Sequence, residues 1–304
     1  MADFYGRPVG VLENEFLRLE YLLESGPRIV RLFFKGSTEN LLAEMPDSTI
    51  PTPYGEYNFM GGHRLWHAPE QLPRTYVPDS AGLEVQASAD NVRLVQPVEA
   101  PTGIRKSMKI RLQPGKPVVT IEHKLENGGA WTVELAAWAI TQLRLGGVAV
   151  MPQQLPSDPV RRLLPDRLLA IWAYTKLSDP RLHLHNDVIL VDGLAAQPPC
   201  KIGVMNRRGW TGYLYKDIFF NKRFTLCGDD PQPDFGCNNE IYVDHRFIEV
   251  ETLGPLKKLE PGQSVVHTET WELTGGLDYP ATVAGVRAMA VDLKLNEAEL
   301  LLAE

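Results

Sequence analysis

The sequence predicts an all-β fold, a large antiparallel β-sandwich with a short helical segment at its C-terminal end. Three observations lead to this prediction. Many segments alternate apolar and polar residues with the period of two that half-buried strands show. Turn dipeptides such as Gly128-Gly129 and Pro261-Gly262 separate these segments. Helix signals are scarce and lie near the end of the chain.

The strand patterns begin near residue 16 and recur along most of the chain. Between Phe16 and Ser25, apolar residues at 17, 19 and 21 alternate with Arg18 and Glu20. Gly26-Pro27 ends this segment, and a second strand is predicted over 28–36. The same pattern predicts strands over 107–112, 118–127, 131–140, 181–191, 201–205, 241–253 and 264–273.

The two helix signals follow the last predicted strand. Pro280 suits the first turn of a helix, and Asn296 is a suitable N-cap for a last short one. No repeat of solenoid or propeller period and no Gly/Ser-rich linker divides the chain. We therefore expect one β-sandwich domain over 1–304, with a sheet core of about 9–273 and a helical tail over 280–304.

Composition narrows the classes of partner and compartment. The chain has 304 residues, of which 44% are apolar and 23% charged, and a formal net charge of −7, which argues against nucleic-acid binding. The N-terminus shows no signal peptide, and the longest apolar run, 135–150, is interrupted and too short to span a bilayer. Three cysteines at unrelated spacings suit a reducing compartment. We expect a cytoplasmic protein without a membrane partner, and the oligomeric state stays open.

Familiar cofactor and catalytic motifs are missing from the sequence. It contains no GxGxxG after a strand, no GxxxxGK[ST], no GxSxG and no HExxH, and no cysteine pair has zinc-ligand spacing. His183 and His185 form an HxH pair, but Leu182 and Leu184 take the buried face of that strand, so the histidines are expected to face solvent. We therefore expect neither a cofactor nor a metal, and any chemistry must come from scattered residues.

The stretch GGHRLWHAPE, residues 61–70, concentrates His63, Arg64, Trp66 and His67 directly after a glycine pair. A buried strand would not carry these polar groups without partners, and a surface loop does not need a tryptophan. The stretch is therefore either one rim of a binding cleft or a structural corner. In a strand, two of the four side chains would face the cleft and two would pack against the sheet, and alternation does not tell which pair faces the cleft.

Glu249 and Glu251 are the paired carboxylates of the sequence. Alternation places both on one face of a strand, about 6.5–7 Å apart, with Ile248 and Val250 on the other face. Their repulsion should raise one of the two pKa values, which suits a general acid or base. The alternative is an exposed strand face with two solvated glutamates. A glycosidase also needs two carboxylates, but across a sugar and usually from different strands.

Three segments resemble galactose mutarotase-like proteins, a superfamily that includes the aldose 1-epimerases. RIVRLFFKGSTENLL resembles the opening hairpin of that superfamily, and GGHRLWHAPE resembles the Gly-Gly…Trp-Pro segment of its sugar-phosphate epimerase branch. FIEVETLGPLKKLEPGQSVVHTETWEL resembles the closing portion, with its LxPGxSxxHTExW pattern. The resemblance runs from about Val9 to Leu273 and is to an uncharacterised branch of the superfamily.

The resemblance implies an antiparallel β-supersandwich whose concave face binds a small carbohydrate. Aldose 1-epimerases open and reclose a sugar ring with a glutamate base at the anomeric hydroxyl and a histidine acid at the ring oxygen. By motif position the base is Glu251, with Glu249 beside it. Arg64 would contact sugar hydroxyls, while Trp66 and Trp138 would line the cleft.

The sequence departs from the superfamily where the histidine acid is expected. The matching strand reads Trp138 to Gln142 and contains no histidine. Gln142 is therefore a candidate for contacting the sugar in this region, and His63 or His67 are candidates for the acid. Where the epimerases place an aspartate, Asn239 and Glu240 are candidates for holding sugar hydroxyls, and Lys222 would add a cation; the alternative for all three is a hydrogen-bonded hairpin.

Three functions therefore stay open on the sequence alone. They are an aldose 1-epimerase-type isomerase, a catalytically silent carbohydrate-binding module, and a glycosidase or lyase on the same scaffold.

Overall fold

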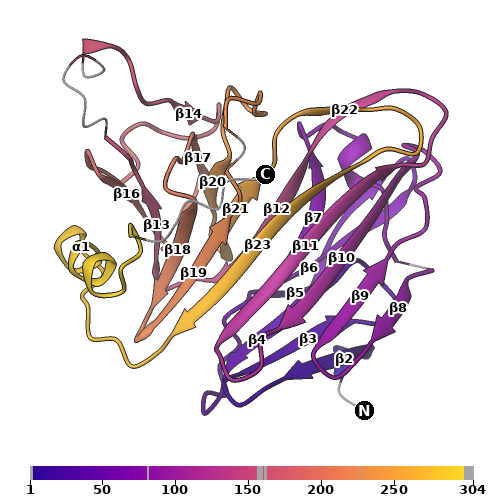
Figure 1. Ribbon diagram of the computed structural model, residues 1–304, viewed down its shortest axis with the longest axis horizontal. Helices are drawn as coiled ribbons and strands as arrows, with labels where there is room; N and C mark the ends of the chain where they lie inside the picture. Colours follow the sequence, from indigo (N-terminus) through magenta and orange to yellow (C-terminus); the bar gives the residue numbers. More distant parts are fainter. Residues whose placement is uncertain (1–2, 81, 156–159, 161–162, 227, 298–304) are drawn as a thin grey trace.

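The computed structural model describes residues 3–297 except for 81, 156–159, 161–162 and 227, and two large antiparallel sheets make up most of this part (Figure 1). Among the described residues the first sheet has eleven strands. Ten follow in the spatial order β1 (Asp3–Phe4), β2 (Arg7–Glu13), β3 (Leu17–Leu22), β4 (Arg28–Phe34), β7 (His63–Ala68), β12 (Val133–Arg144), β21 (Phe247–Leu253), β20 (Asn239–Val243), β17 (Cys200–Val204) and β14 (Leu169–Ile171), and β22 (Lys257–Leu259) pairs with β12.

The second sheet has ten strands within the same described ranges. Their spatial order is β15 (Leu182–Leu184), β16 (Val188–Asp192), β13 (Val148–Pro152), β18 (Trp210–Tyr215), β19 (Ile218–Phe224), β23 (Ser264–Thr274), β11 (Val118–Asn127), β10 (Ile104–Leu112), β9 (Asn91–Val95) and β8 (Glu84–Ala87). A separate hairpin joins β5 (Glu44–Thr52) to β6 (Gly55–Gly61), and a single 3-10 turn, η1, spans Arg74–Tyr76. The predicted all-β antiparallel sandwich is confirmed.

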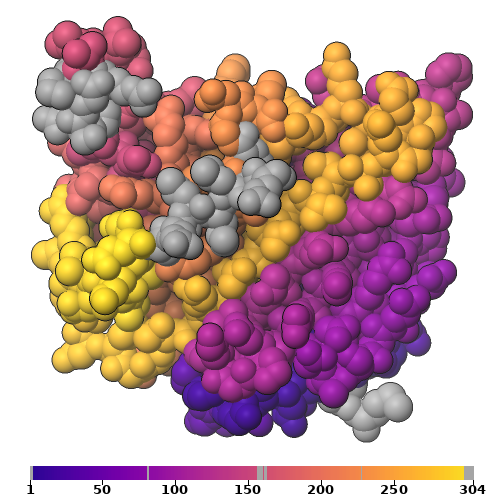
Figure 2. Space-filling model, in the orientation of Figure 1, coloured from indigo at the N-terminus to yellow at the C-terminus, as the bar shows by residue number. Residues whose placement is uncertain are grey.

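The main core lies between the two large sheets, because each strand sends alternate side chains inward. In β11, Val119, Ile121 and Leu125 are fully buried, whereas Glu122 on the other face is exposed. They belong to one cluster with residues of the eleven-stranded sheet such as Leu65. Figure 2 shows the face formed by the ten-stranded sheet, with β23 crossing it as a diagonal band.

The one α-helix among the described residues, α1 (Val283–Asp292), packs on the ten-stranded sheet. The hydroxyl of Thr282 accepts a hydrogen bond from the backbone N–H of Gly285 and so caps its N-terminus. Val286 and Met289 are buried against Val148 and Trp210, which places the helix at the edge of the molecule in Figure 1. The predicted C-terminal helical segment is thus confirmed, while the last turn predicted after Asn296 falls mostly in 298–304, outside the described residues.

Two predicted strands are hairpins in the structure. The segment 241–253 contains most of β20 and all of β21, and between them the Asp244 carboxylate accepts hydrogen bonds from the backbone N–H groups of Arg246 and Phe247. An aspartate side chain that accepts a hydrogen bond from the backbone N–H two residues later can form a turn without glycine or proline. No glycine or proline therefore marks this turn in the sequence. The segment 181–191 likewise divides into β15 and β16.

Within the part of the chain that the structure describes, no helix has the length and apolar character needed to cross a membrane.

Candidate functional site

A cleft lies over five neighbouring strands of the eleven-stranded sheet, β7, β12, β21, β20 and β17, on the face that points away from the ten-stranded sheet. Strand register brings its side chains together: Ile140 pairs with Arg64 on one side and Glu251 on the other, and Glu251 pairs with Glu240. One step along the strands, Gln142 pairs with Glu249, Glu249 with Tyr242, and Tyr242 with Lys201.

The cleft has a volume of about 350 Å³ and largely aromatic walls. Its rim comes from the β5–β6 hairpin, from the segment around η1 and from the loop after β14. The side chains that line it are Ser48, Phe59, Arg64, Trp66, Glu70, Tyr76, Trp138, Ile140, Trp172, Tyr174, Pro199, Lys201, Tyr242, Asp244, Arg246, Phe247 and Glu249. A concave site with aromatic walls and a few convergent polar groups is typical of small-molecule binding.

Of the paired carboxylates Glu249 and Glu251, Glu249 is the one that lines the cleft. Its Oε1 accepts hydrogen bonds from Arg64 at 3.0 Å and from Gln142 at 2.9 Å, whereas its Oε2 has no hydrogen-bond partner among the described residues. Burial raises the pKa of Glu249 to about 7; the guanidinium of Arg64 opposes this shift and the charge of Glu251 adds to it. The group therefore changes charge near neutral pH and has one oxygen free to take a proton.

Glu251 lies behind Glu249 and is fully buried. Its Oε2 accepts hydrogen bonds from the indole N–H of Trp138 at 2.6 Å and from the Lys201 ammonium at 2.9 Å. Burial alone would raise the pKa of Glu251, but the charge and hydrogen bond of Lys201 outweigh it and lower the pKa. The carboxyl whose pKa is raised is therefore Glu249, and not Glu251, the base expected from motif position, because of the two only Glu251 contacts the lysine.

Lys201 lines the cleft and bonds two fully buried carboxylates. Its Nζ lies 2.8 Å from Glu240 Oε2 and 2.9 Å from Glu251 Oε2. Burial would lower the pKa of Lys201, but the two carboxylates hold it well above the ordinary value, so the ammonium is permanently charged. Burial raises the pKa of Glu240 well above its usual range. A Cβ at Gly203 would lie 2.7 Å from Cys237 Sγ and 3.2 Å from Glu240 Cγ, so glycine leaves room for both side chains.

Two cations of the site, Arg64 and Lys201, lie over tryptophan rings. The guanidinium carbon of Arg64 lies 4.3 Å from the ring centroid of Trp66. The Lys201 nitrogen lies 4.7 Å from the centroids of both Trp138 and Trp172. Cation–π attraction of this kind strengthens where the charge is desolvated. It fixes the cations and occupies one face of each ring.

The stretch 61–70 contains strand β7, and the alternation of this strand divides the predicted residues between two faces. Arg64 and Trp66 line the cleft, whereas His63 and His67 do not. The glycine pair before β7 is required by the backbone: Gly62 has a φ of +71°, and a Cβ there would lie 2.0 Å from the carbonyl oxygen of Ile29 in β4.

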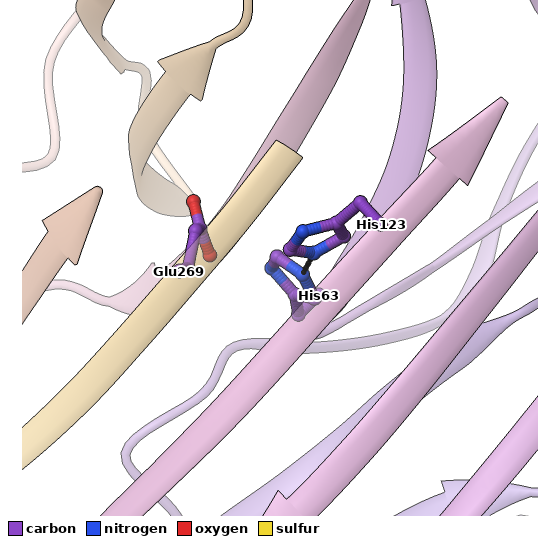
Figure 3. A group of neighbouring side chains, drawn as sticks. All are labelled: His63, His123 and Glu269. Carbon is purple, nitrogen blue, oxygen red and sulfur yellow. Dashed lines mark hydrogen bonds between the residues drawn. The ribbon is translucent and has the colours of Figure 1, made fainter. Parts of the chain in front are cut away.

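His63 points between the two sheets and belongs to a chain of neutral histidines (Figure 3). His123 Nδ1 donates to the carbonyl oxygen of His267 at 3.0 Å, so its Nε2 accepts from His63 Nε2 at 2.7 Å. His63 Nδ1 then accepts from the hydroxyl of Thr141 at 2.8 Å. Burial holds the pKa of His63 well below its ordinary value. His63 is thus a satisfied interior group in this structure, on the face of the sheet away from the cleft.

Lys222 lies in the same interior layer, paired with Glu269 of β23. The Nζ–Oε1 distance is 2.8 Å and both side chains are fully buried. Glu269 also accepts hydrogen bonds from the Trp271 indole at 2.9 Å and from the hydroxyl of Thr252. Lys222 therefore neutralises an interior carboxylate, and its side chain does not line the cleft.

The donor atoms of His63, His123 and Glu269 lie within 4.8 Å of one another, a spacing at which a metal could be held. Both nitrogens of the two imidazoles are engaged in the hydrogen bonds described above. Glu269 is paired with an ammonium group. Because the donors already have complementary partners, the group is best described as a hydrogen-bonded network that joins the sheets.

Asn239 also lies away from the cleft. Its amide donates to the backbone carbonyl of Glu251 at 2.9 Å, and its side-chain oxygen accepts from Asn206 at 3.1 Å. Of the eleven predicted site residues, the structure gathers seven in and under the cleft. They are Arg64, Trp66, Trp138, Gln142, Glu240, Glu249 and Glu251.

Sequence reasoning missed the lysine and the second set of aromatic residues. Lys201 lay in a predicted strand, but its two carboxylate partners are brought beside it only by the pairing of β17 with β20 and of β20 with β21. Trp172 and Tyr174 follow the short strand β14, in a segment that carried no periodic signal. Tyr242 shares a face with Glu240 by alternation, and this spacing was the one signal that could have found it.

Comparisons with known proteins support the fold. No protein-family model matches the sequence, and no curated protein matches it. Solved structures match nevertheless, and they show that this chain has the fold of galactose mutarotase-like proteins.

Three solved structures illustrate the likeness. A candidate aldose 1-epimerase from Escherichia coli K12 has a TM-score of 0.55 at 13% identity, over 89% of this chain and 100% of that one. A galactose mutarotase-like protein from Lactobacillus casei has a TM-score of 0.54 at 12% identity, over 88% and 100%. A TPR-domain containing protein from Parabacteroides distasonis has a TM-score of 0.60 at 14% identity, over 91% of this chain and 50% of that one. At such identities the likeness shows the fold, and function must come from the site.

Proposed function

We propose that the cleft binds a small carbohydrate and that the protein is an aldose 1-epimerase-type isomerase with Glu249 as its general base. The observation that carries the proposal is a carboxylate with a pKa of about 7 and one free oxygen, at the floor of an aromatic cleft. A base whose pKa lies near the operating pH is deprotonated in a large fraction of the molecules and is still basic enough to take a proton from the substrate. The shared fold with aldose 1-epimerase and mutarotase-like structures supports the choice of substrate class.

The reaction needs one proton removed and one supplied. Glu249 takes the proton of the anomeric hydroxyl, a carbonyl forms at C1, and the C1–O5 bond breaks with its electron pair going to the ring oxygen. That oxygen takes up a proton, for which the phenol of Tyr242 beside Glu249 is the candidate donor, and the positive charge of Lys201 stabilises the negative charge that forms on it. Rotation about the C1–C2 bond and reversal of these steps give the other anomer. Glu251 and Glu240 hold the Lys201 ammonium in place.

Replacement of Glu249 tests the proposal. Glu249→Gln keeps the shape of the side chain and removes the base, so anomeric exchange should fall about 10²–10⁴-fold. Exchange is followed by NMR saturation transfer between anomers on a panel of neutral, acidic and phosphorylated aldoses. Glu122→Gln, an exposed change on β11, is the matched control and should exchange like the wild type. Equal rates in wild type and Glu249→Gln would rule out this base.

A catalytically silent carbohydrate-binding module is the second candidate, and one observation favours it. None of the described residues that line the cleft is a histidine, the usual acid of the superfamily. In that case the wild type would shift sugar resonances on binding while exchange stayed at the buffer rate.

A further inference from the structure

A second pocket lies on the other side of the segment that borders the cleft. The chain from Glu70 to Tyr76 separates the two cavities: Tyr76 lines the cleft, whereas Arg74 lines the second pocket. This pocket has a volume of about 280 Å³, room for a small molecule, and lies among η1, β7, β10 and β12. We name it the β7–η1 pocket.

His67 is an unsatisfied polar group in the wall of the β7–η1 pocket. The residue is 1% exposed, and neither ring nitrogen has a hydrogen-bond partner. Buried polar side chains in native proteins are almost always paired, and an unpaired one calls for a specific explanation. Burial, with the nearby charges of Lys106 and Arg74 adding to it, holds the pKa of His67 well below its ordinary value. The neutral ring offers one N–H donor; the backbone carbonyl groups of Arg74 and His67 lie near the ring, but neither forms a hydrogen bond of normal geometry with it.

Arg74 is a cation without an acidic partner. Its Nη2 donates to the carbonyl oxygen of Pro69 at 2.8 Å, its Nε is buried without a partner, and it forms no ion pair with any described carboxylate. The buried acid Glu99, which accepts a hydrogen bond from the pocket residue Thr102, is already paired with Lys106 at 2.5 Å. Most of the remaining guanidinium donors are therefore available to an anion, and their planar fork matches a carboxylate.

The other walls of the β7–η1 pocket are largely apolar. The apolar residues are Leu72, Pro73, Pro101, Ile104, Val133 and Leu135, and Tyr54, Gln71 and Thr102 complete the lining. Such walls disfavour a multiply charged, fully hydrated anion and suit a short hydrocarbon tail. The pocket therefore combines one cationic, hydrogen-bonding side with one hydrophobic side.

We propose that the β7–η1 pocket is a second binding site, which takes a small monocarboxylate with a short apolar tail. Arg74 and His67 bind the carboxylate, and Val133 and Leu135 contact the tail. The site is separate from the carbohydrate cleft and does not depend on the function proposed for it. Because Arg74 and Tyr76 belong to the same turn, a bound carboxylate would lie directly behind the wall of the cleft.

Methyl NMR of the full chain tests the site with butyrate and benzoate as probes and butyramide and benzamide as uncharged controls. The carboxylates should shift the methyl resonances of Val133 and Leu135 at millimolar concentration and leave that of Ile140, in the cleft, unchanged. Arg74→Gln should weaken this binding about ten- to hundredfold, as expected for loss of charge-assisted hydrogen bonds. Arg93→Gln, an exposed arginine-to-glutamine change on β9, should bind like the wild type.

The same experiment can overturn the site in three ways. Amides that bind as tightly as the carboxylates would show that the pocket does not recognise charge. Equal affinity in wild type and Arg74→Gln would remove Arg74 from the site, and shifts confined to Ile140 would place the carboxylates in the cleft. Glu249→Gln must bind butyrate normally, so failure of the proposed isomerase would leave this result untouched.

Discussion

At the scale of single residues, one lysine decides how two adjacent carboxylates differ. Glu249 and Glu251 share a strand face and are both buried, yet the pKa of one is raised and that of the other lowered. The difference follows from contact: Lys201 bonds Glu251 directly, while Arg64 only partly offsets the burial of Glu249. Separated pKa values in neighbouring carboxyls are a recurrent arrangement in acid–base sites.

The pH dependence of exchange follows from the pKa of Glu249. The base must be deprotonated to act, so kcat/KM should rise with pH through about 7 and fall below it as Glu249 takes up a proton. Anomeric exchange measured from pH 5 to 9, corrected for the buffer rate, gives this profile.

Lys201→Met provides the control for this assignment. The ammonium lowers the pKa of Glu249, so its removal should move the midpoint to higher pH. Lys109→Met, an exposed lysine on β10, should leave the midpoint unchanged. A flat profile in the wild type would exclude Glu249 as the titrating base.

At the scale of elements, strand β21 serves two layers at once. Its residues 249 and 251 face the cleft side, whereas the hydroxyl of Thr252 contacts Glu269 and His267 between the sheets. The backbone carbonyl of Val250 accepts from Lys222 at 2.9 Å. The cleft floor is therefore supported from behind by the buried ion pair of Lys222 and Glu269.

Breaking this ion pair should lower the free energy of unfolding more than breaking a surface ion pair does. Glu269→Gln leaves the Lys222 ammonium buried without its counter-charge, so the free energy of unfolding should fall by about 3–5 kcal/mol. Urea denaturation followed by tryptophan fluorescence measures the change.

A surface pair on the same strand is the matched control. Glu272→Gln removes the partner of Arg223 on the outer face of β23 and should cost about 1 kcal/mol or less. The double variant Lys222→Met/Glu269→Leu should recover much of the loss, because no uncompensated charge remains. A cost below 1 kcal/mol for Glu269→Gln would contradict the role given to the pair.

Local pattern predicted roughly half of the strands in the described chain, and only part of the site. β11 has the bounds that its alternation predicted, 118–127, because the alternation is regular and Pro114-Gly115 and Gly128-Gly129 flank it. Alternation also placed Arg64 and Trp66 on the face opposite to His63 and His67. Which face meets the cleft depends on how the second sheet packs, and the position of Lys201 depends on pairings between distant strands. Neither the packing of the second sheet nor the pairing of distant strands can be recognised from the local sequence.

At the scale of the whole molecule, the two sheets interleave the first and last parts of the chain. β12 lies between β7 and β21, and β23 lies between β11 and β19. No continuous stretch of the chain forms either large sheet by itself. Loss of one strand would therefore leave unpaired strand edges both in strands from the early part of the sequence and in strands from the late part.

This interleaving predicts a single cooperative unfolding transition. Urea denaturation should give the same midpoint by far-UV circular dichroism, which reports on the sheets, and by tryptophan fluorescence, which reports on the cleft and core. Two midpoints separated by about 1 M urea or more would show that one sheet survives the other. The Glu269→Gln variant should move both signals together, since the pair links the sheets.

The path of β12 through its sheet also has a consequence for synthesis. During translation this almost wholly buried, apolar strand leaves the ribosome more than a hundred residues before β21 completes its second edge. The nascent chain therefore exposes an unpaired apolar strand during much of its elongation. Aggregation commonly begins at such strand edges. We therefore expect the yield of native protein to depend on chaperone binding at this stage. In refolding in vitro, we expect the yield to depend on a low protein concentration.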